Sequence, residues 1–243
     1  MKRFLIMMSL VFSSLAIAGV YKEPFTNGMY IVDGDVSFPD LESAKGYLNS
    51  SNNKLIVNLK GLKTFDIWNK TMRKKLTYCI SDSFKDKKAD VIEAFKVATE
   101  DWMSVAGVKF IYKSEEDAKC DATNNNVVFD INPVSLGKYL ARAFFPSNER
   151  AKRNVMIDTS SFRHSFVALS GFLRHELGHV LGFRHEHAAG LLNPACAEGE
   201  EFSPVTEYDR LSVMHYPQCG GLNKIENLVL SELDKDGARK IYP

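Results

Sequence analysis

The chain has 243 residues, of which 45% are hydrophobic and 25% are charged, and its formal net charge is +1. These values are those of an ordinary globular protein, and no heptad run or internal repeat indicates a fibrous one. The balanced charge excludes the basic excess of a typical nucleic-acid-binding protein, so we expect no nucleic-acid partner.

The N-terminus has the pattern of a secretory signal peptide. Met1-Lys2-Arg3 is a charged start, residues 4–17 are apolar, and Ala16-Ile17-Ala18 is a cleavage site of the A-x-A type. The apolar stretch is too short to span a membrane stably. We therefore expect residues 1–18 to be removed and the protein to be secreted or periplasmic, without a membrane span.

Residues 19–62 differ in composition from the rest of the chain. They contain three clusters of turn-forming residues, which are Thr26-Asn27-Gly28, Asp33-Gly34-Asp35 and Asn49-Ser50-Ser51-Asn52-Asn53. A segment of this size is too small to form a core of its own. The sequence therefore indicates a short N-terminal segment, followed by one domain over residues 63–243.

Residues 63–243 show the order of elements of a two-lobed α+β domain. A helix from Lys87 to Val105 carries one apolar stripe, and a second helix is expected from about Phe166 to Leu181. A last helix starts near Ser231, where Asp234 gives a close relative of the capping box. We expect a mixed sheet with five strands, at residues 76–81, 108–113, 127–131, 139–145 and 153–158.

The second of these helices contains a metal-binding pattern. His175 and His179 lie four residues apart, which places both imidazoles on one helix face, where they can bind a single metal ion. Glu176 is about 100° around the helix from His175, so it points beside the metal and serves as a base for a water and not as a ligand. This arrangement is typical of zinc peptidases.

A third ligand requires a turn in the chain, because His185 would face away from the metal if the helix continued. Gly182 lies just before it, and glycine adopts the left-handed conformation that ends helices. The chain can therefore bring His185 back to the metal. Three protein ligands leave one position open for water, as in catalytic zinc sites. His164 and His187 have no such spacing, and we expect them to be surface residues.

The full motif from His175 to Glu186 resembles that of the metzincin clan of zinc peptidases. The glutamate after the third histidine and the segment Ser212-Val213-Met214-His215-Tyr216 resemble the astacin family, whose Met-turn reads S-x-M-H-Y. This resemblance implies that Met214 forms an apolar floor beneath the zinc. It also implies that Tyr216 approaches the zinc, either as a ligand or as a hydrogen-bond donor to the oxyanion. Matrixin-like and serralysin-like peptidases share the histidine motif, so a more distant place in the clan is the alternative.

The same resemblance gives the N-terminal segment a role. A secreted peptidase needs to be kept inactive during export, so residues 19–62 are interpreted as an inhibitory pro-segment. Residues 32–36 resemble the astacin pro-motif F-x-G-D, whose Asp displaces the catalytic water from zinc. The resemblance implies that Asp35 is the zymogen switch, with Asp33 in reserve.

Activation then requires a cut before the catalytic domain. We expect it between Lys54 and Asp66, with Lys60 or Lys63 as the cleavage residue. In astacins the new N-terminus is bridged by water to the glutamate after the third histidine, which here is Glu186. By the same likeness, residues 138–145 form the edge strand along which an extended substrate pairs.

Four cysteines in an exported chain imply up to two disulfides, for which three connectivities are possible. We favour Cys196–Cys219, which would clamp the loop between the third ligand and the region past the Met-turn. Cys79–Cys120 would then join the first strand to the loop after the second. A cysteine that blocks the zinc is disfavoured, because residues 19–65 contain none.

These patterns predict a secreted zinc endopeptidase that is made as a zymogen and acts as a monomer on proteins or peptides. One Zn²⁺ per chain would polarise the scissile carbonyl, and Glu176 would pass a proton from water to the leaving amine. Tyr216 and the metal would stabilise the oxyanion. Two other interpretations stay open: a catalytically silent zinc-binding or adhesion protein, and a hydrolase of a non-peptide bond.

Overall fold

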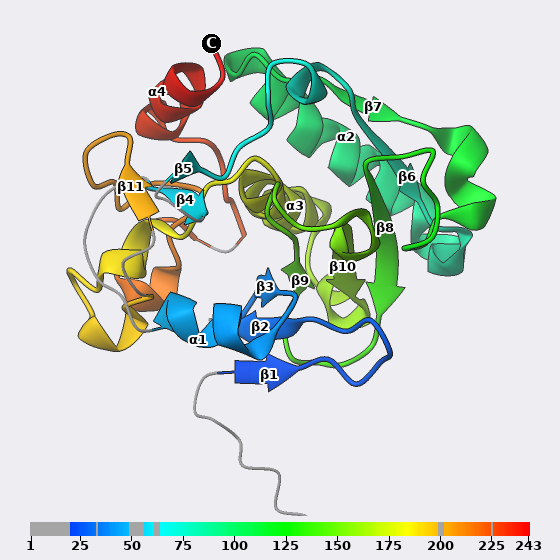
Figure 1. Cartoon of the computed structure of the whole chain (residues 1–243), viewed down its shortest axis with the longest axis horizontal. Helices are drawn as coiled ribbons and strands as arrows, with labels where there is room; N and C mark the ends of the chain where they lie inside the picture. Colours follow the sequence, from blue (N-terminus) through cyan, green and yellow to red (C-terminus); the bar gives the residue numbers. More distant parts are fainter. Residues whose placement is uncertain (1–19, 33, 49–55, 61–63, 199–201, 225) are drawn as a thin grey trace, which may run out of the picture.

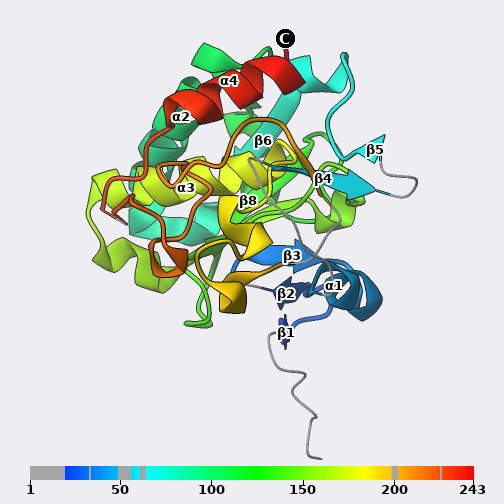
Figure 2. The ribbon, with the colours of Figure 1, turned by 90° about the vertical axis from the view of Figure 1, so that its left-hand side faces the viewer.

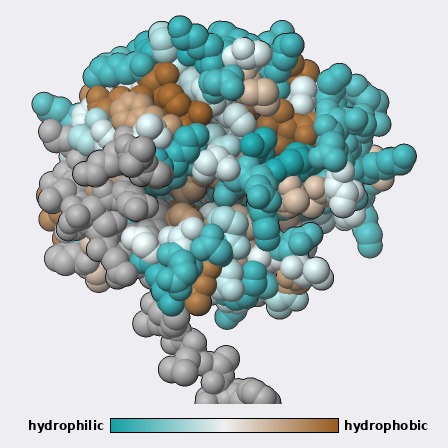
Figure 3. Space-filling view, viewed as in Figure 1, coloured by the Kyte–Doolittle hydropathy of each residue, from teal (hydrophilic) through white to brown (hydrophobic). Residues whose placement is uncertain are grey.

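The computed structural model describes residues 20–32, 34–48, 56–60, 64–198, 202–224 and 226–243. The predicted signal peptide, the reserve aspartate Asp33 and the candidate cleavage residue Lys63 lie outside these residues. Within the described part of the chain, no helix is both long and apolar enough to cross a membrane. The face shown in Figure 3 is mostly hydrophilic, with small separate hydrophobic patches.

The centre of the molecule is the predicted α+β domain with a five-stranded mixed sheet. The strand order is β7-β6-β8-β10-β9, in which β9 at one edge is antiparallel to β10 and the other neighbours are parallel. The strands are β6 (Leu76–Ile80), β7 (Phe110–Tyr112), β8 (Phe129–Val134), β9 (Ala141–Arg142) and β10 (Asn154–Asp158).

The edge strand β9 is shorter than the predicted 139–145. Beyond Arg142 the backbone is engaged elsewhere: the carbonyl of Ala143 accepts a hydrogen bond from the Ser37 hydroxyl. The amide of Phe145 donates to Asn148 Oδ1 over 2.9 Å. The chain therefore leaves the sheet after two residues. The pattern of apolar and polar residues does not reveal this early end.

Three helices complete the domain, and their positions agree with the sequence. The helices α2 (Lys88–Val105) and α3 (Phe166–Val180) pack against each other beside the sheet (Figure 1). The predicted stripe of α2 is buried in the main core. Helix α4 (Glu232–Ile241) begins with a full capping box between Ser231 and Asp234, which satisfies amide groups at its first turn.

The N-terminal segment forms a small sheet of its own and packs against the domain. It forms an antiparallel sheet of β1 (Val20–Lys22), β2 (Tyr30–Val32) and β3 (Val36–Phe38), followed by α1 (Leu41–Leu48). Figures 1 and 2 place it at the end of the molecule opposite to α4. Its apolar side chains are buried in two clusters that include Tyr139 and Phe145 of the domain.

A third, small sheet connects the two parts. It has the order β11-β4-β5, with β4 (Ile56–Lys60), β5 (Thr64–Phe65) and β11 (Phe202–Pro204). Strand β4 also bonds to the chain just after α3, through Asn58 N to Gly182 O (2.8 Å) and Arg184 N to Ile56 O (2.8 Å). Lys60, one of the two candidate cleavage residues, is the last residue of β4.

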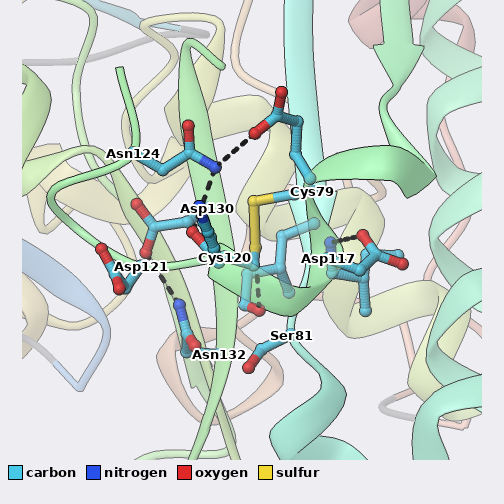
Figure 4. Close-up of a disulfide and its surroundings, with 12 residues drawn as sticks. Cys79, Ser81, Asp117, Cys120, Asp121, Asn124, Asp130 and Asn132 are labelled. Carbon is cyan, nitrogen blue, oxygen red and sulfur yellow. Dashed lines mark hydrogen bonds between the residues drawn. A yellow bond between two sulfur atoms is a disulfide. The ribbon is translucent and has the colours of Figure 1, made fainter. Parts of the chain in front are cut away.

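Both disulfides have the pairing that the sequence favoured. Cys79–Cys120 ties β6 to the loop before β8, with a Cα–Cα distance of 5.6 Å (Figure 4). Cys196–Cys219 spans 5.9 Å and closes the loop after the third predicted ligand. Because all four cysteines are paired, no thiolate is available to bind a metal.

Candidate metal centre

The helix that carries the first two histidines is built into the core. Its N-terminus is capped by Ser165, whose hydroxyl accepts from the amide of Ala168, and nearly every later residue of α3 is buried. His175 and His179 lie on the same face, with ring centroids 5.0 Å apart. The buried helix thereby holds both rings in fixed positions.

Helix α3 ends at the predicted glycine. Gly182 has a φ of 94°, in the left-handed region, and its amide bonds to the carbonyl of His179 (2.8 Å). The amide of Phe183 bonds to the carbonyl of Gly178 (2.9 Å). This pair of bonds is a Schellman motif, in which glycine is favoured because it has no Cβ. The turn directs the chain back towards the two rings.

Gly182→Ala should therefore destabilise the fold by about 3 kcal/mol, since a Cβ would add strain to a left-handed residue and crowd the backbone. At this position a Cβ would lie 2.2 Å from the carbonyl oxygen of Asp66. Chemical denaturation of both proteins measures the difference. Gly46→Ala is the control, because a Cβ there meets nothing within 4 Å. Equal stability of the two variants would contradict this explanation.

The turn brings His185 to the same place as the first two rings. Its Nε2 lies 3.1 Å from Nε2 of His175, and its ring centroid lies 4.8 Å from that of His179. All three predicted ligands are buried. The structure therefore assembles three imidazoles from two elements around one point.

The other ring nitrogens fix the orientation of these histidines. Nδ1 of His175 bonds to the carbonyl of Val213 (2.8 Å), and Nδ1 of His179 bonds to the carbonyl of Phe183 (2.8 Å). Because a carbonyl only accepts, each Nδ1 carries the proton and each Nε2 presents a lone pair. Burial lowers the pKa of His179 to about 4, which keeps its ring neutral at pH 7.

Asp35 of the N-terminal segment occupies the centre of this cluster. Its carboxylate lies 3.0 Å from Nε2 of His185, 3.2 Å from that of His175 and 3.8 Å from that of His179. Burial alone would raise the pKa of Asp35, but the neighbouring imidazoles, led by His185, outweigh it and hold the pKa well below its ordinary value. These four side chains form a set that could hold one metal ion.

Glu176 lies next to His175 in the chain and lines the same cavity as Asp35. Its side chain is buried, and within the described residues its Oε2 has no hydrogen-bond partner. Burial, followed by the negative charge of Asp35, raises its pKa well above the ordinary value. The charge of Asp35 thus adds to burial in favouring the protonated form of this carboxyl.

The Met-turn packs beneath α3. Met214 is fully buried, and Gly178 makes room for it, because a Cβ at that position would lie 2.3 Å from the methionine sulfur. The turn is fixed by Asp234, which accepts from the Ser212 hydroxyl (2.6 Å) and from the amide of Val213 (2.7 Å). The sequence predicted Asp234 only as a helix cap, but it also supports this turn.

Tyr216 packs against two of the histidines. Its ring centroid lies 4.3 Å from that of His185 and 5.5 Å from that of His175. A Cβ on Gly34 would lie 3.5 Å from the Tyr216 hydroxyl, and Gly34 has a φ of 96°. A Cβ at that distance would only touch the hydroxyl, so it is the left-handed backbone conformation that favours glycine at this position.

One histidine prediction is wrong, and it leads to a residue that the sequence did not reveal. His164 is exposed as expected, but His187 is buried, with an exposed fraction of 1%. Its Nε2 lies 3.0 Å from Oε1 of Glu198, and the same oxygen lies 2.5 Å from Nδ1 of His185. His187 is buried because it shares this carboxylate. Glu198 lies outside the histidine motif and has no recognisable spacing from it, so nothing in the sequence singled it out.

Glu198→Gln should weaken zinc binding about 10- to 100-fold, because a carboxylate that accepts from a metal-binding imidazole orients the ring and increases its basicity. Titration of the metal-free protein with zinc, against a competing chelator, measures the change. Glu207→Gln is the matched control, since it makes the same change of side chain at an exposed glutamate. An unchanged zinc affinity would show that Glu198 does not support the site.

Glu186 is buried without a cationic partner among the described residues. Its Oε1 accepts from the amide of Asp209 (2.5 Å), and its Oε2 has no partner there. Burial raises its pKa well above the ordinary value. Glu186 directly follows His185, the third predicted ligand. Its contact with a new N-terminus stays a prediction.

A cavity of about 600 Å³ opens beside Asp35 and Glu176. Its walls are mainly apolar and include Tyr139, Leu140, Phe172, Leu228 and the Cys196–Cys219 disulfide. A cavity of this size can accept a large side chain next to the candidate metal centre.

Comparison with known proteins supports this description. The family model for matrixin matches residues 67–216, which is more than half of the chain and includes the three histidines, Met214 and Tyr216. Two solved structures of myroilysin share the fold. The first has 18% sequence identity and a TM-score of 0.52, and the match covers 73% of this chain and 96% of that chain. The second has 17% sequence identity and a TM-score of 0.51, and the match covers 81% of this chain and 91% of that chain. No curated protein matches. The sequence motifs favour the astacin family, with a matrixin-like or serralysin-like peptidase as the alternative. The matrixin match supports this alternative better than it supports the astacin assignment.

Proposed function

The chain belongs to the matrixin family of metalloendopeptidases, and on that premise we propose that it is a secreted zinc endopeptidase made in a latent form. Zinc would be held by His175, His179 and His185. Residues 19–62 would act as the pro-segment, and residues 63–243 would form the catalytic domain. The substrates would be proteins or peptides, and we expect a monomer.

The observation that carries this proposal is the convergence of three buried Nε2 atoms on one point, around the carboxylate of Asp35. Imidazole is a usual zinc ligand, and three histidines with one further position are the ligand set of a catalytic site. Two polar atoms of the cluster, His179 Nε2 and Asp35 Oδ1, are buried without a hydrogen-bond partner in the described chain. A cation between them would satisfy both, so the residues fit the metal.

The chemistry follows from the positions of the side chains. Zinc, when bound, supplies Lewis acidity that polarises the scissile carbonyl and makes a nearby water more acidic. Glu176 takes a proton from this water and gives it to the leaving nitrogen. Tyr216, packed against two of the histidines, would donate its hydroxyl hydrogen to the developing oxyanion.

Latency would come from Asp35, as the likeness of residues 32–36 to the astacin pro-motif implies. A carboxylate is a legitimate zinc ligand, and Asp35 lies within 3.8 Å of all three Nε2 atoms. In this position it would take the place that the catalytic water needs. The cavity beside it would stay accessible while the reacting centre is closed.

Activation would follow a cut between Lys54 and Asp66. The astacin likeness gives Glu186 as the acceptor for the new N-terminus, through a bridging water. The buried, partly unpartnered carboxyl of Glu186 supports this role, because a nearby positive charge would lower the cost of its burial.

Cleavage of a peptide library by the matured protein, with and without a chelator, tests the proposal. Metal analysis and mass spectrometry of the same sample give the metal and the N-terminus. We expect about one zinc per chain and hydrolysis that stops when zinc is removed. Zinc binding without hydrolysis would favour a silent binding protein, and hydrolysis unaffected by chelation would contradict the metal mechanism.

A further inference from the structure

A second contact of the N-terminal segment lies at the edge strand, away from Asp35. Glu23 and Arg142 form an ion pair in which both side chains have an exposed fraction of 0%. Arg142 Nε donates to Oε1 and its Nη2 donates to Oε2, each over 2.8 Å. The Tyr139 hydroxyl donates to Oε1 over 2.6 Å. Three donors of the catalytic domain thus converge on one carboxylate.

The segment presents this carboxylate on a short, closed loop. The amide of Glu23 bonds to the carbonyl of Met29 (3.0 Å), and the amide of Met29 bonds back to Glu23 Oε2 (2.7 Å). Lys152 of the domain donates to the carbonyl of Asn27 over 2.9 Å. Burial alone would raise the pKa of Glu23, but Arg142 and the other donors outweigh it and lower the pKa. The loop therefore carries an ionised carboxylate.

The side chains that bind this carboxylate, which we call the receptor, are Arg142 and Tyr139. The position of Arg142 does not depend on the N-terminal segment. Arg142 Nη1 bonds to both the side-chain oxygen (2.5 Å) and the carbonyl (3.0 Å) of Asn154 on β10. This anchors the guanidinium and leaves Nε and Nη2 as a parallel fork, which matches the two oxygens of a carboxylate. Removal of the segment would leave a fixed fork and one hydroxyl without their acceptor.

This receptor adjoins the reacting centre. Tyr139, Leu140 and Ala141, which precede Arg142 in the chain, line the same cavity as His175 and Glu176. Strand β9 is an edge strand, and it adjoins this cavity. A substrate that paired with β9 would therefore pass close to Tyr139 and Arg142.

We propose that Arg142 and Tyr139 form a substrate subsite for an acidic side chain, and that Glu23 fills this subsite in the latent chain. The proposal rests on the proposed peptidase function and names a preference within it. A guanidinium that loses its anion in a poorly solvated position is strongly destabilised, so a carboxylate of the substrate would restore what maturation removes.

The test uses the matured enzyme and pairs of peptides that differ only by Glu or Gln. The substituted position is moved through three residues on either side of the cleaved bond. We expect one position at which Glu raises kcat/KM at least about tenfold over Gln, mainly by lowering KM. Arg142→Gln should bring this ratio close to one, and Tyr139→Phe, which removes a single donor, should lower it several-fold.

Lys152→Gln is the matched control, since it removes a nearby positive charge that does not contact Glu23. A ratio that falls as much in this variant as in Arg142→Gln would point to general attraction and overturn a specific subsite. Should Arg142→Gln not fold, the wild-type ratio and its change in Tyr139→Phe decide. Cleavage without any Glu preference overturns the subsite and leaves the peptidase standing. No cleavage of any peptide overturns the proposed function and the subsite with it.

Discussion

Glu176→Ala is expected to bind zinc as tightly as the wild type and to lose peptide hydrolysis by about a thousandfold or more. The carboxyl is buried beside the three histidines and bonds to none of them, and its Oε2 has no partner in the described structure. Its removal takes away the proton acceptor and leaves the ligands in place. Zinc content and kcat/KM, measured on one matured sample, give both quantities.

Glu93→Ala is a suitable control, because Glu93 is an exposed acid on α2. It should leave hydrolysis and zinc content unchanged. If Glu176→Ala kept a substantial part of the activity, the base would have to be another group. Loss of zinc together with activity would instead give Glu176 a role in holding the metal.

Asp35→Ala is expected to abolish latency, so that the precursor processes itself at least about tenfold faster than the wild type. Asp35 is the only acid of the described N-terminal segment within 4 Å of the three histidine Nε2 atoms. Its loss would leave the reacting position open to water. Gel analysis of the precursor over time measures the rate of processing.

Two further variants make this result specific. Glu42→Ala removes an acid with a largely exposed side chain from the same segment and should leave processing at the wild-type rate. Asp35→Ala combined with Glu176→Ala should stay uncut, which would show that the precursor's own active site makes the cut. A precursor of Asp35→Ala that is as stable and as latent as the wild type would exclude Asp35 as the switch.

The sequence predicted those parts of the site that depend on local spacing. The four-residue step from His175 to His179 and the break at Gly182 are properties of one helix and its end, so the order of residues determines them. The capping box of Ser231 and Asp234 was visible for the same reason. The five strands were also found, apart from the early end of β9.

Contacts between distant residues were not visible in this way. Glu198 reaches His185 across a loop of irregular conformation, and no periodic pattern marks it. The burial of His187 depends on this contact, so it was assigned to the surface. Glu23 and Arg142 are 119 residues apart, and each is an ordinary charged residue in its own neighbourhood. Partners of this kind follow from the tertiary fold and not from local sequence.

Under the proposed activation, strand β4 would link maturation to the loop that carries His185. It lies between the β11 strand and the turn at Gly182, and two of its backbone bonds hold residues 182 and 184. A cut after Lys60 would separate β4 from the domain that it supports. The released peptide would then have to stay bound as a non-covalent strand, or the loop leading to His185 would lose two hydrogen bonds at the moment the enzyme becomes active. The site of the proposed cut would therefore set how rigidly the mature enzyme holds His185.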